Sequence, residues 1–434
     1  MTDQAATRIR ISGGRVIDPA NDIDRITDLF LADGRVVALG AAPDGFRAES
    51  NIDASGRIVA PGLIDLCARL REPGQEHKAT IAGETAAAVA GGITTLCVPP
   101  DTDPVIDTPA VVELIHQRAE LSGKARVVTI GALTLGLDGE RLSEMAALRE
   151  AGCPGVSNCL RPIGNTHIQR RAMEYAGTYG LTVFLHAQDP WLADGGCAHE
   201  GPVASRMGLP GIPAAAEIAA VARDLALIEQ TGVRAHFCRL TTARAVQMVA
   251  RAQYDGAPVT ADVAVPYLFL TEMDLAGFNA QCHVNPPFRT QRDREALRAA
   301  LVRGTLGAIC SDHQPHEADA KLAPFAATEP GISGIDTLLG LTLKLVEEGV
   351  LTLPQAIERL TAGPAAMLGL SDHGRLNPGA VADIVVFDAD AHWRVTTDSL
   401  HSSGHNTPFE GWELSGRVSH TLVAGRLVYG RAGT

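Results

Sequence analysis

The sequence lacks the features that mark several large classes of protein. No apolar run in its 434 residues approaches the length needed to span a bilayer, and the first residues, MTDQAATRIRIS, contain no apolar segment of a secretory signal. No block of lysine or arginine offsets the formal net charge of −13, so we do not expect nucleic-acid binding, which needs a basic patch. The GxSxG motif of serine hydrolases and the glycine-rich phosphate loop are also absent.

The cysteines and the overall composition indicate a globular chain with reduced thiols. The eight cysteines are scattered, with no CxxC pair and no regular spacing, which in a chain of this size favours free thiols and the cytoplasm. Hydrophobic residues make up 46% and charged residues 20%, an ordinary globular balance. The length allows one large domain and a smaller one.

Both ends of the chain have the texture of short strands joined by tight turns. Such pairs around Gly13-Gly14, Asp33-Gly34 and Ala424-Gly425 are typical of hairpins and turns. We expect a small β-sandwich built from both termini, residues 1–57 and 372–434, around an inserted middle. The expected strands lie within Ile9–Ile17, Leu29–Ala32, Val36–Leu39, Asp383–Phe387, Val418–Val423 and Arg426–Val428.

The middle of the chain, residues 58–371, alternates apolar strands with helical stretches such as Ala214–Glu229 and Thr290–Val302. Eight such units predict an α/β fold, a (β/α)8 barrel, whose chemistry sits at the carboxyl ends of the strands. The eight predicted strands are Leu63–Leu70, Thr94–Val98, Arg126–Ile130, Gly155–Cys159, Thr182–His186, Ala235–Leu240, Val259–Val263 and Gly307–Ser311.

Short motifs over essentially the whole chain add a family resemblance. They are Pro61-Gly62-Leu63-Ile64-Asp65, Leu70-Arg71-Glu72-Pro73-Gly74, Gly91-Gly92-Ile93-Thr94-Thr95, Asn285-Pro286-Pro287-Phe288-Arg289, Ser311-Asp312-His313-Gln314-Pro315-His316, Gly379-Ala380-Val381-Ala382-Asp383 and Asn406-Thr407-Pro408-Phe409-Glu410-Gly411. Together they resemble the class I dihydroorotases of the metal-dependent amidohydrolase superfamily. The resemblance implies a zinc site that polarises a ring carbonyl and activates a hydroxide.

The positions that would hold the metal are mostly substituted in this chain. The resemblance places a His-x-His pair at the end of the first strand, paired aspartates after the fourth, histidines on the fifth and sixth, and an aspartate on the eighth. The surviving ligand positions are His186 and Asp312, of which Asp312 would be a vestigial catalytic base. The replaced positions are Cys67, Arg69, Asn158, Cys159 and Arg239.

The positions that would hold the substrate are mixed. Arg71 and Asn285 are kept at positions that the resemblance places against the substrate carboxylate. Asp101 stands where the family has asparagine, and a fixed anion there should compete with an anionic substrate. Tyr267 falls in the seventh-strand loop where the family has a Pro-His-His stretch.

Three other histidines could be considered as metal ligands. They are His236, His313 and His316. We interpret the first as a core residue or a support for neighbouring groups, and the other two as structural residues that close the site.

Two arginines in a zinc pocket have a definite physical consequence. A guanidinium group is permanently protonated, has no lone pair for a metal, and would repel one. A carboxylate left unpaired in the barrel would be costly. We therefore hypothesise that Arg69 or Arg239 pairs with Asp312 or Asp101 and so replaces the metal charge. Without a metal, water would keep its pKa near 15.7 and the reaction would lose its nucleophile.

Three functions follow as hypotheses. The first is a non-catalytic, oligomeric dihydroorotase-like protein without cofactor, a structural partner of aspartate carbamoyltransferase; that partner comes from the resemblance alone. The second is an active hydrolase of dihydroorotate or a related cyclic amide, with a zinc site rebuilt from Cys67, Cys159, His186 and Asp312. The third is a protein that binds an anionic ligand through Arg71 and Asn285.

Overall fold

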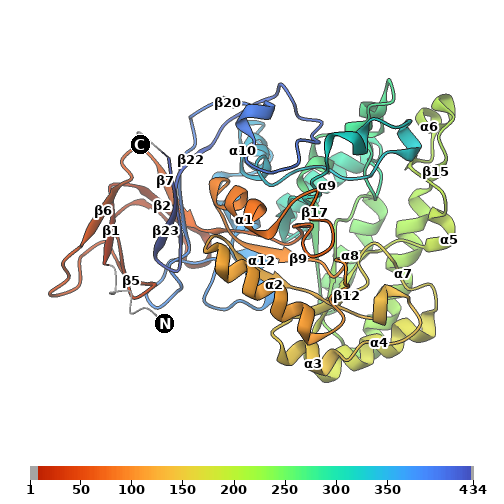
Figure 1. The fold of residues 1–434 in the computed structure, drawn as a ribbon, viewed down its shortest axis with the longest axis horizontal. Coiled ribbons are helices and arrows are strands. Elements are labelled where there is room, and N and C mark those ends of the chain that lie inside the picture. The colour runs from red at the N-terminus through yellow and green to blue at the C-terminus, as the bar shows by residue number, and fades with distance from the viewer. Residues whose placement is uncertain (1–7, 432–434) are drawn as a thin grey trace.

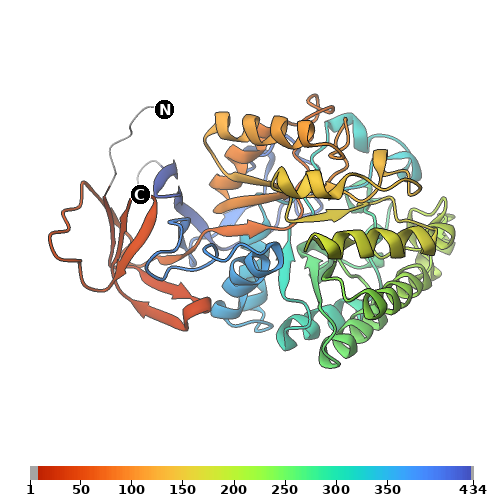
Figure 2. The ribbon, with the colours of Figure 1, turned by 90° about the horizontal axis from the view of Figure 1, so that it is seen from below.

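The computed structural model describes residues 8–431 and contains a barrel and a β-sandwich, placed at opposite ends of the molecule in Figure 1 and Figure 2. Parallel pairing links the barrel strands in chain order, and β11 (Gly131–Ala132) continues β10 to reach β12. A parallel bridge between Ala68 and His313 closes the ring. The barrel strands are β8 (Leu63–Asp65), β9 (Ile93–Val98), β10 (Arg126–Thr129), β12 (Gly155–Ser157), β13 (Thr182–Leu185), β16 (Ala235–Phe237), β17 (Val259–Ala264) and β18 (Ala308–Cys310). The predicted (β/α)8 barrel is confirmed.

The first barrel strand is shorter than the prediction of Leu63–Leu70. Regular pairing stops at Asp65 because its buried carboxylate accepts hydrogen bonds from the Cys67 amide at 3.3 Å and the Ser311 amide at 2.9 Å. The chain then continues beside the eighth strand, where the Arg69 amide donates to the His313 carbonyl at 2.9 Å. This arrangement holds residues 67–71 at the carboxyl end of the barrel, where the family site would lie.

Helices between the strands cover the outside of the barrel (Figure 2). The predicted helices at 214–229 and 290–302 are confirmed as α7 and α9, and α9 begins at a capping box formed by Thr290 and Asp293. The helices are α1 (Ile81–Ala90), α2 (Pro109–Ser122), α3 (Met145–Glu150), α4 (Thr166–Thr178), α5 (Pro190–Ala193), α6 (Pro202–Met207), α7 (Ala214–Thr231), α8 (Ala243–Tyr254), α9 (Gln291–Arg303), α10 (Leu338–Glu347), α11 (Leu353–Leu360) and α12 (Ala362–Leu368). None of the helices within residues 8–431 is long and apolar enough to cross a membrane.

The sandwich combines strands from both ends of the chain, as the sequence predicts. One sheet has the order β5-β4-β1-β6 and the other β23-β22-β19-β7-β2-β3, with a separate apolar core between them. The strands are β1 (Ile9–Ser12), β2 (Arg15–Asp18), β3 (Ile23–Ile26), β4 (Leu29–Ala32), β5 (Arg35–Leu39), β6 (Ser50–Asp53), β7 (Ile58–Pro61), β19 (Ile384–Asp388), β22 (Arg417–Val423) and β23 (Arg426–Gly430).

The boundary between the two parts differs in one detail from the predicted ranges. The strand β7 pairs with β2 and β19 in the sandwich, although the predicted boundary after residue 57 assigns it to the barrel. The outermost parts of the predicted ranges, residues 1–7 and 432–434, lie outside the described residues.

Candidate functional site at the mouth of the barrel

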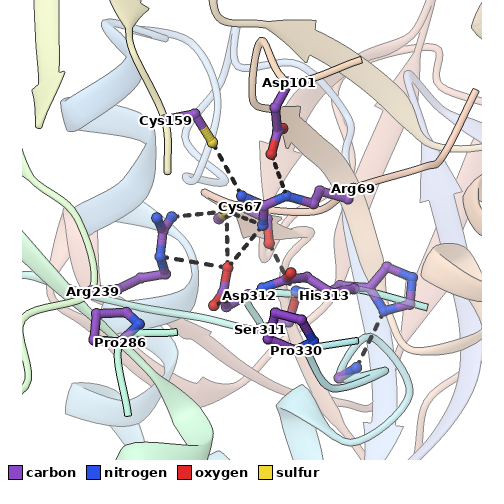
Figure 3. A network of polar contacts seen from close by, with 12 residues as sticks. Cys67, Arg69, Asp101, Cys159, Arg239, Pro286, Ser311, Asp312, His313 and Pro330 are labelled. Atoms are coloured by element: carbon purple, nitrogen blue, oxygen red, sulfur yellow. Dashed lines mark hydrogen bonds and ion pairs between the residues drawn. The ribbon is translucent and has the colours of Figure 1, made fainter. Parts of the chain in front are cut away.

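Most of the side chains predicted to line the metal pocket come from the ends of several barrel strands and meet at the mouth of the barrel. Figure 3 shows five of them together: Cys67, Arg69, Cys159, Arg239 and Asp312. Cys159, Arg239 and Asp312 have positive φ angles of 50°, 52° and 47°, and Arg71 has one of 63°. Residues with side chains rarely adopt this left-handed conformation, which persists only where the surrounding structure fixes it. Four such residues at four strand ends indicate a rim whose backbone geometry is tightly determined.

Arg69 lies at the centre of this rim and contacts both remaining carboxylates. Its Nε donates to Asp101 Oδ2 at 2.8 Å, and its Nη1 donates to Asp312 Oδ1 at 3.2 Å. Its Nη2 donates to Cys159 Sγ at 3.1 Å (Figure 3). The side chain is only 5% exposed. The hypothesis that an arginine pairs with Asp312 or Asp101 is confirmed, since one guanidinium group joins them.

Arg239 approaches the same carboxylate from the sixth strand. Its Nε lies 3.5 Å from Asp312 Oδ1, and its Nη1 donates to Cys67 Sγ at 3.0 Å. The thiol of Cys67 donates in turn to Asp312 Oδ1 at 3.3 Å. Gln314 donates to the other oxygen, Oδ2, at 3.2 Å. Asp312 Oδ1 is therefore in contact with two guanidinium groups and a thiol, and Oδ2 accepts from the Gln314 amide.

The cluster is electrically balanced at neutral pH. Burial alone would lower the pKa of Arg69, but the negative charges of Asp101 and then Asp312 hold it well above the ordinary value. Burial works to raise the pKa of Asp101, yet Arg69 holds it below the ordinary value. Burial raises the pKa of Cys67 well above the usual range and that of Cys159 to about 12, so both thiols stay neutral. Two guanidinium groups thus face two carboxylates.

The residues present do not fit the zinc ions that the family resemblance implies. Within residues 8–431, no group of three or more histidine, cysteine, aspartate or glutamate side chains is placed to share a metal ion. Guanidinium nitrogens lie against Cys67, Cys159 and Asp312, three of the four ligands of the rebuilt site considered from the sequence. A dication at this place would meet two fixed cations and protonated thiols.

The fourth candidate ligand, His186, faces a different partner. Its Nε2 lies 2.8 Å from Gln188 Oε1, and Gln188 Nε2 donates to Asn285 Oδ1 at 3.2 Å. Burial, and next the charge of Arg239, lowers the pKa of His186 to about 3, so the ring is neutral near pH 7. His186 Nδ1 is buried without a hydrogen-bond partner, and the ring lines an internal cavity of about 20 Å³ with Cys67 and Arg239. Such a cavity has room for about one water molecule.

The predicted substrate-holding residues are not brought together. Arg71 donates to the Pro315 carbonyl at 3.0 Å and to Gln75 Oε1 at 3.2 Å, and its Nη2 lies 3.0 Å from His316 Nε2. Asn285 instead lines a separate cleft of about 610 Å³. The structure therefore does not support an anion site shared by these two residues.

Asp101 was expected to act as an anion next to Arg71. Asp101 instead forms its ion pair with Arg69, and burial followed by the charge of Arg69 lowers the pKa of Arg71 to about 10. Asp101 thus neutralises the arginine in the metal position, and it influences Arg71 only through the electric field.

At two further substituted positions, Asn158 and Tyr267, the side chains bind loops at the barrel mouth. Asn158 faces away from the cluster: its Oδ1 accepts from the Thr134 amide and hydroxyl at 3.2 and 2.9 Å, and its Nδ2 donates to the Arg161 carbonyl at 2.9 Å. The hydroxyl of Tyr267 donates to the Pro286 carbonyl at 2.5 Å. Both side chains fix loops around the mouth and leave no group for the metal pocket.

The three remaining histidines have structural contacts. His236 is fully buried, with Nδ1 2.8 Å from Thr260 Oγ1 and Nε2 3.2 Å from Asp262 Oδ2. His313 Nδ1 accepts from the Gly334 amide at 3.2 Å, so its Nε2 carries the proton that points at Glu84 Oε2, 3.0 Å away. His316 lies among Arg71, Lys78 and the Pro330 carbonyl, and burial lowers its pKa to about 3.

Several residues of the site were not identified from the sequence. Gln188 and Gln314 bind His186 and Asp312, and Glu84 binds His313. Glutamine two residues after a strand-end ligand position recurs in both His186-x-Gln188 and Asp312-x-Gln314. That repeated spacing is a signal that could have drawn attention to both amides.

Comparisons with known proteins identify the family of the chain. The family model described as "Dihydro-orotase-like" matches residues 56–245, and the "Amidohydrolase family" model matches residues 336–429. The chain is 54% identical to the "Dihydroorotase-like protein" of Pseudomonas aeruginosa, over 97% of this chain and 99% of the relative. It is 44% identical to the "Dihydroorotase" of Anaeromyxobacter dehalogenans strain 2CP-1, over 96% and 97%.

Solved structures with similar folds belong to hydantoinases. The L-hydantoinase (dihydropyrimidinase) from Arthrobacter aurescens superposes with a TM-score of 0.86 at 23% identity, over 97% of this chain and 96% of that one. The dihydropyrimidinase from Brevibacillus agri NCHU1002 gives a TM-score of 0.84 at 23% identity, over 98% and 95%. These likenesses define the class of fold, an amidohydrolase barrel with a β-rich domain. At the level of sequence, the chain belongs to the dihydroorotase-like family of amidohydrolases.

Proposed function

We propose that this chain is a non-catalytic member of the family that acts in the cytoplasm as a structural and assembly partner of aspartate carbamoyltransferase. The observation that carries the first half of the proposal is the position of Arg69, which joins Asp101 to Asp312 where the resemblance places metal ions. The relative in Pseudomonas aeruginosa carries the name "Dihydroorotase-like protein", which is compatible with it.

The site is assembled in a way that favours retention for shape. Asp312, the carboxylate that would serve as base, accepts from Arg69, Gln314 and Cys67 and faces Arg239. A base so occupied cannot accept a proton from a reacting group without breaking an ion pair. The barrel around it remains closed and well packed, which suits a scaffold.

The assembly role is tested by mixing the purified chain with aspartate carbamoyltransferase from the same cells. The proposal predicts that the two co-elute in size-exclusion chromatography and that carbamoyl transfer depends on the chain. Asn285→Ala is the matched control, since it removes a substrate-holding position of the family but should leave assembly unchanged. Separate elution, with carbamoyl transfer unaffected by the chain, would contradict the role.

The second candidate is a hydrolase of dihydroorotate or a related cyclic amide. It is favoured by the "Dihydroorotase" name of the relative from Anaeromyxobacter and by the hydantoinase-like fold. It requires that zinc displace Arg69 and Arg239 from their partners. Stoichiometric zinc together with ring opening of dihydroorotate would establish it.

A further inference from the structure

A second cleft, unrelated to the barrel mouth, lies where the C-terminal strands meet the barrel. It has a volume of about 230 Å³ and shares no lining residue with the arginine cluster. Its walls come from the end of α1, from α10, from the short strand β20 (Trp393–Arg394), from the segment 398–401 that includes the exposed Asp398, and from β22 and β23. These elements are labelled in Figure 1. The volume is below the roughly 300–1,000 Å³ typical of pockets for drug-sized ligands, so a ligand here would be small.

Two arginines line this cleft, Arg431 and Arg417, of which Arg417 stands at the start of β22. Its guanidinium carbon lies 5.9 Å from the centre of the Trp393 ring, and the side chain is half-buried. Within residues 8–431 it makes no ion pair with a carboxylate, and no carboxylate is among the groups that shift its pKa. Burial lowers its pKa, and the charge of the nearby Arg431 adds to the effect. Arg417 is thus a partly desolvated guanidinium group without a carboxylate partner, and it lies near the guanidinium group of Arg431. A bound anion would be stabilised at such a place.

The acidic residue that is buried in the cleft does not supply that counter-ion. Asp336 is 5% exposed and accepts from the backbone amides of His401 and Ser402 at 2.9 and 3.1 Å. Its Oδ1 also lies 3.3 Å from His401 Nδ1, and this contact raises the pKa of His401. Asp336 therefore binds the backbone at residues 401–402 and not Arg417. Its negative charge also favours the protonated, positively charged form of the His401 ring.

The flat rings of Trp393, His401 and Tyr429 also line the cleft. Trp393 lies under Arg417, and the rings of His401 and Tyr429 meet edge to face with centroids 6.3 Å apart. Trp393 and Tyr429 are each half-buried, so each keeps ring surface toward the cleft. Aromatic side chains of this kind offer stacking surface to a planar ligand beside a cation that fixes its charge.

We propose that this cleft binds a small organic anion that joins a flat ring to a phosphate or carboxylate group. The anionic group lies against Arg417, and the ring lies against Trp393 or Tyr429. The assignment goes beyond the structural role proposed above and does not depend on it, because a catalytic and a non-catalytic chain would both carry the cleft.

Simple probes test the proposal on the full chain by isothermal titration calorimetry. Phenyl phosphate and benzoate contain the ring and the charge, inorganic phosphate only the charge, and phenol only the ring. We expect a Kd of about 1 mM or tighter for phenyl phosphate or benzoate, and weaker binding of inorganic phosphate and phenol. The tighter of the two ring-bearing anions identifies the source as a phosphate ester or a carboxylate.

Variants separate the cleft from general charge effects. Arg417→Gln should weaken binding at least about tenfold, because a charge-assisted hydrogen bond is lost. Trp393→Leu should weaken it by about two- to tenfold. Arg426→Gln, on the exposed neighbouring strand and outside the lining, is the matched control and should leave Kd unchanged.

Two results would overturn the site. One is the absence of binding by any ring-bearing anion at about 10 mM, above the affinity expected of a functional site. The other is an equal loss of affinity in Arg417→Gln and Arg426→Gln, which would reduce the effect to net charge. Equal binding of phenyl phosphate and inorganic phosphate would overturn the role of the rings. Thermal melting of each variant verifies that it is folded.

Discussion

The two sides of the barrel mouth differ in how they replace the family's metal ligands. On the side of the first and eighth strands, Arg69 and Asp312 form a buried ion-pair cluster. On the side of the fifth and seventh strands, His186, Gln188 and Asn285 form a neutral hydrogen-bonded chain that opens on a cleft of about 610 Å³. The first side is held by charge and the second by amides. The difference teaches that losing a metal leaves a carboxylate to be neutralised, whereas a histidine needs only a neutral partner.

The charged side should be the more sensitive to mutation. Arg69→Met removes the ion-pair partner of Asp101 and leaves Asp312 with Arg239 alone, so we expect the free energy of unfolding to fall by about 3–5 kcal/mol, as for a buried ion pair that loses one partner. Urea denaturation at pH 7 measures it. Arg10→Met, which breaks the surface pair with Asp28, is the control and should cost less than about 1 kcal/mol. Equal losses would remove the distinction between a buried and a surface pair.

The neutral side of the barrel mouth should affect how the free energy of unfolding depends on pH. The folded-state pKa of His186 is lowered to about 3 from 6.5, so the unfolded chain binds its proton first as the pH falls. This histidine therefore contributes stability that is present above about pH 6.5 and is lost as the pH falls toward 3. His186→Asn should lose less stability than the parent between pH 7 and pH 4.5.

Unfolding free energies at the two pH values decide this point. His392→Asn, at an exposed position, controls for the loss of one histidine. If the parent and His186→Asn lose the same stability over this interval, the neutral role of His186 is wrong.

The smallest expected effect is on the amide chain itself. Gln188→Met keeps the length of the side chain but removes the acceptor for His186 and the donor to Asn285. We expect a loss of about 1–3 kcal/mol, because neutral buried groups are left unpaired. Differential scanning calorimetry of Gln188→Met beside Arg69→Met ranks the two sides. A larger effect at Gln188 would reverse the comparison.

The sequence predicted the fold well because the barrel strands are fully buried apolar runs separated by amphipathic helices. It also predicted that Arg69 or Arg239 would pair with Asp312 or Asp101, because a permanently charged side chain inside a barrel must have a counter-ion. Which arginine and which carboxylate would pair was left open, and the structure shows that Arg69 contacts both carboxylates while Arg239 approaches Asp312.

Other parts of the site depended on geometry that no local pattern carries. Arg71 was expected to face a substrate, but it binds the Pro315 carbonyl, which lies 244 positions away in sequence. Asn158 was treated as a replaced ligand, yet its side chain fixes the loop at Thr134. The left-handed backbone conformation at Arg239 and Asp312 directs those side chains inward. A single sequence does not predict this conformation for residues other than glycine.

The most direct test of the account is the metal content of the purified chain, measured by elemental analysis after removal of loosely bound metal, with a dihydroorotase assay on the same sample. Because Arg69 and Arg239 lie against Asp312, where the family resemblance implies a metal, we predict less than about 0.1 metal ion per chain and no turnover. Stoichiometric zinc with turnover would contradict the account and would require that both arginines leave Asp312.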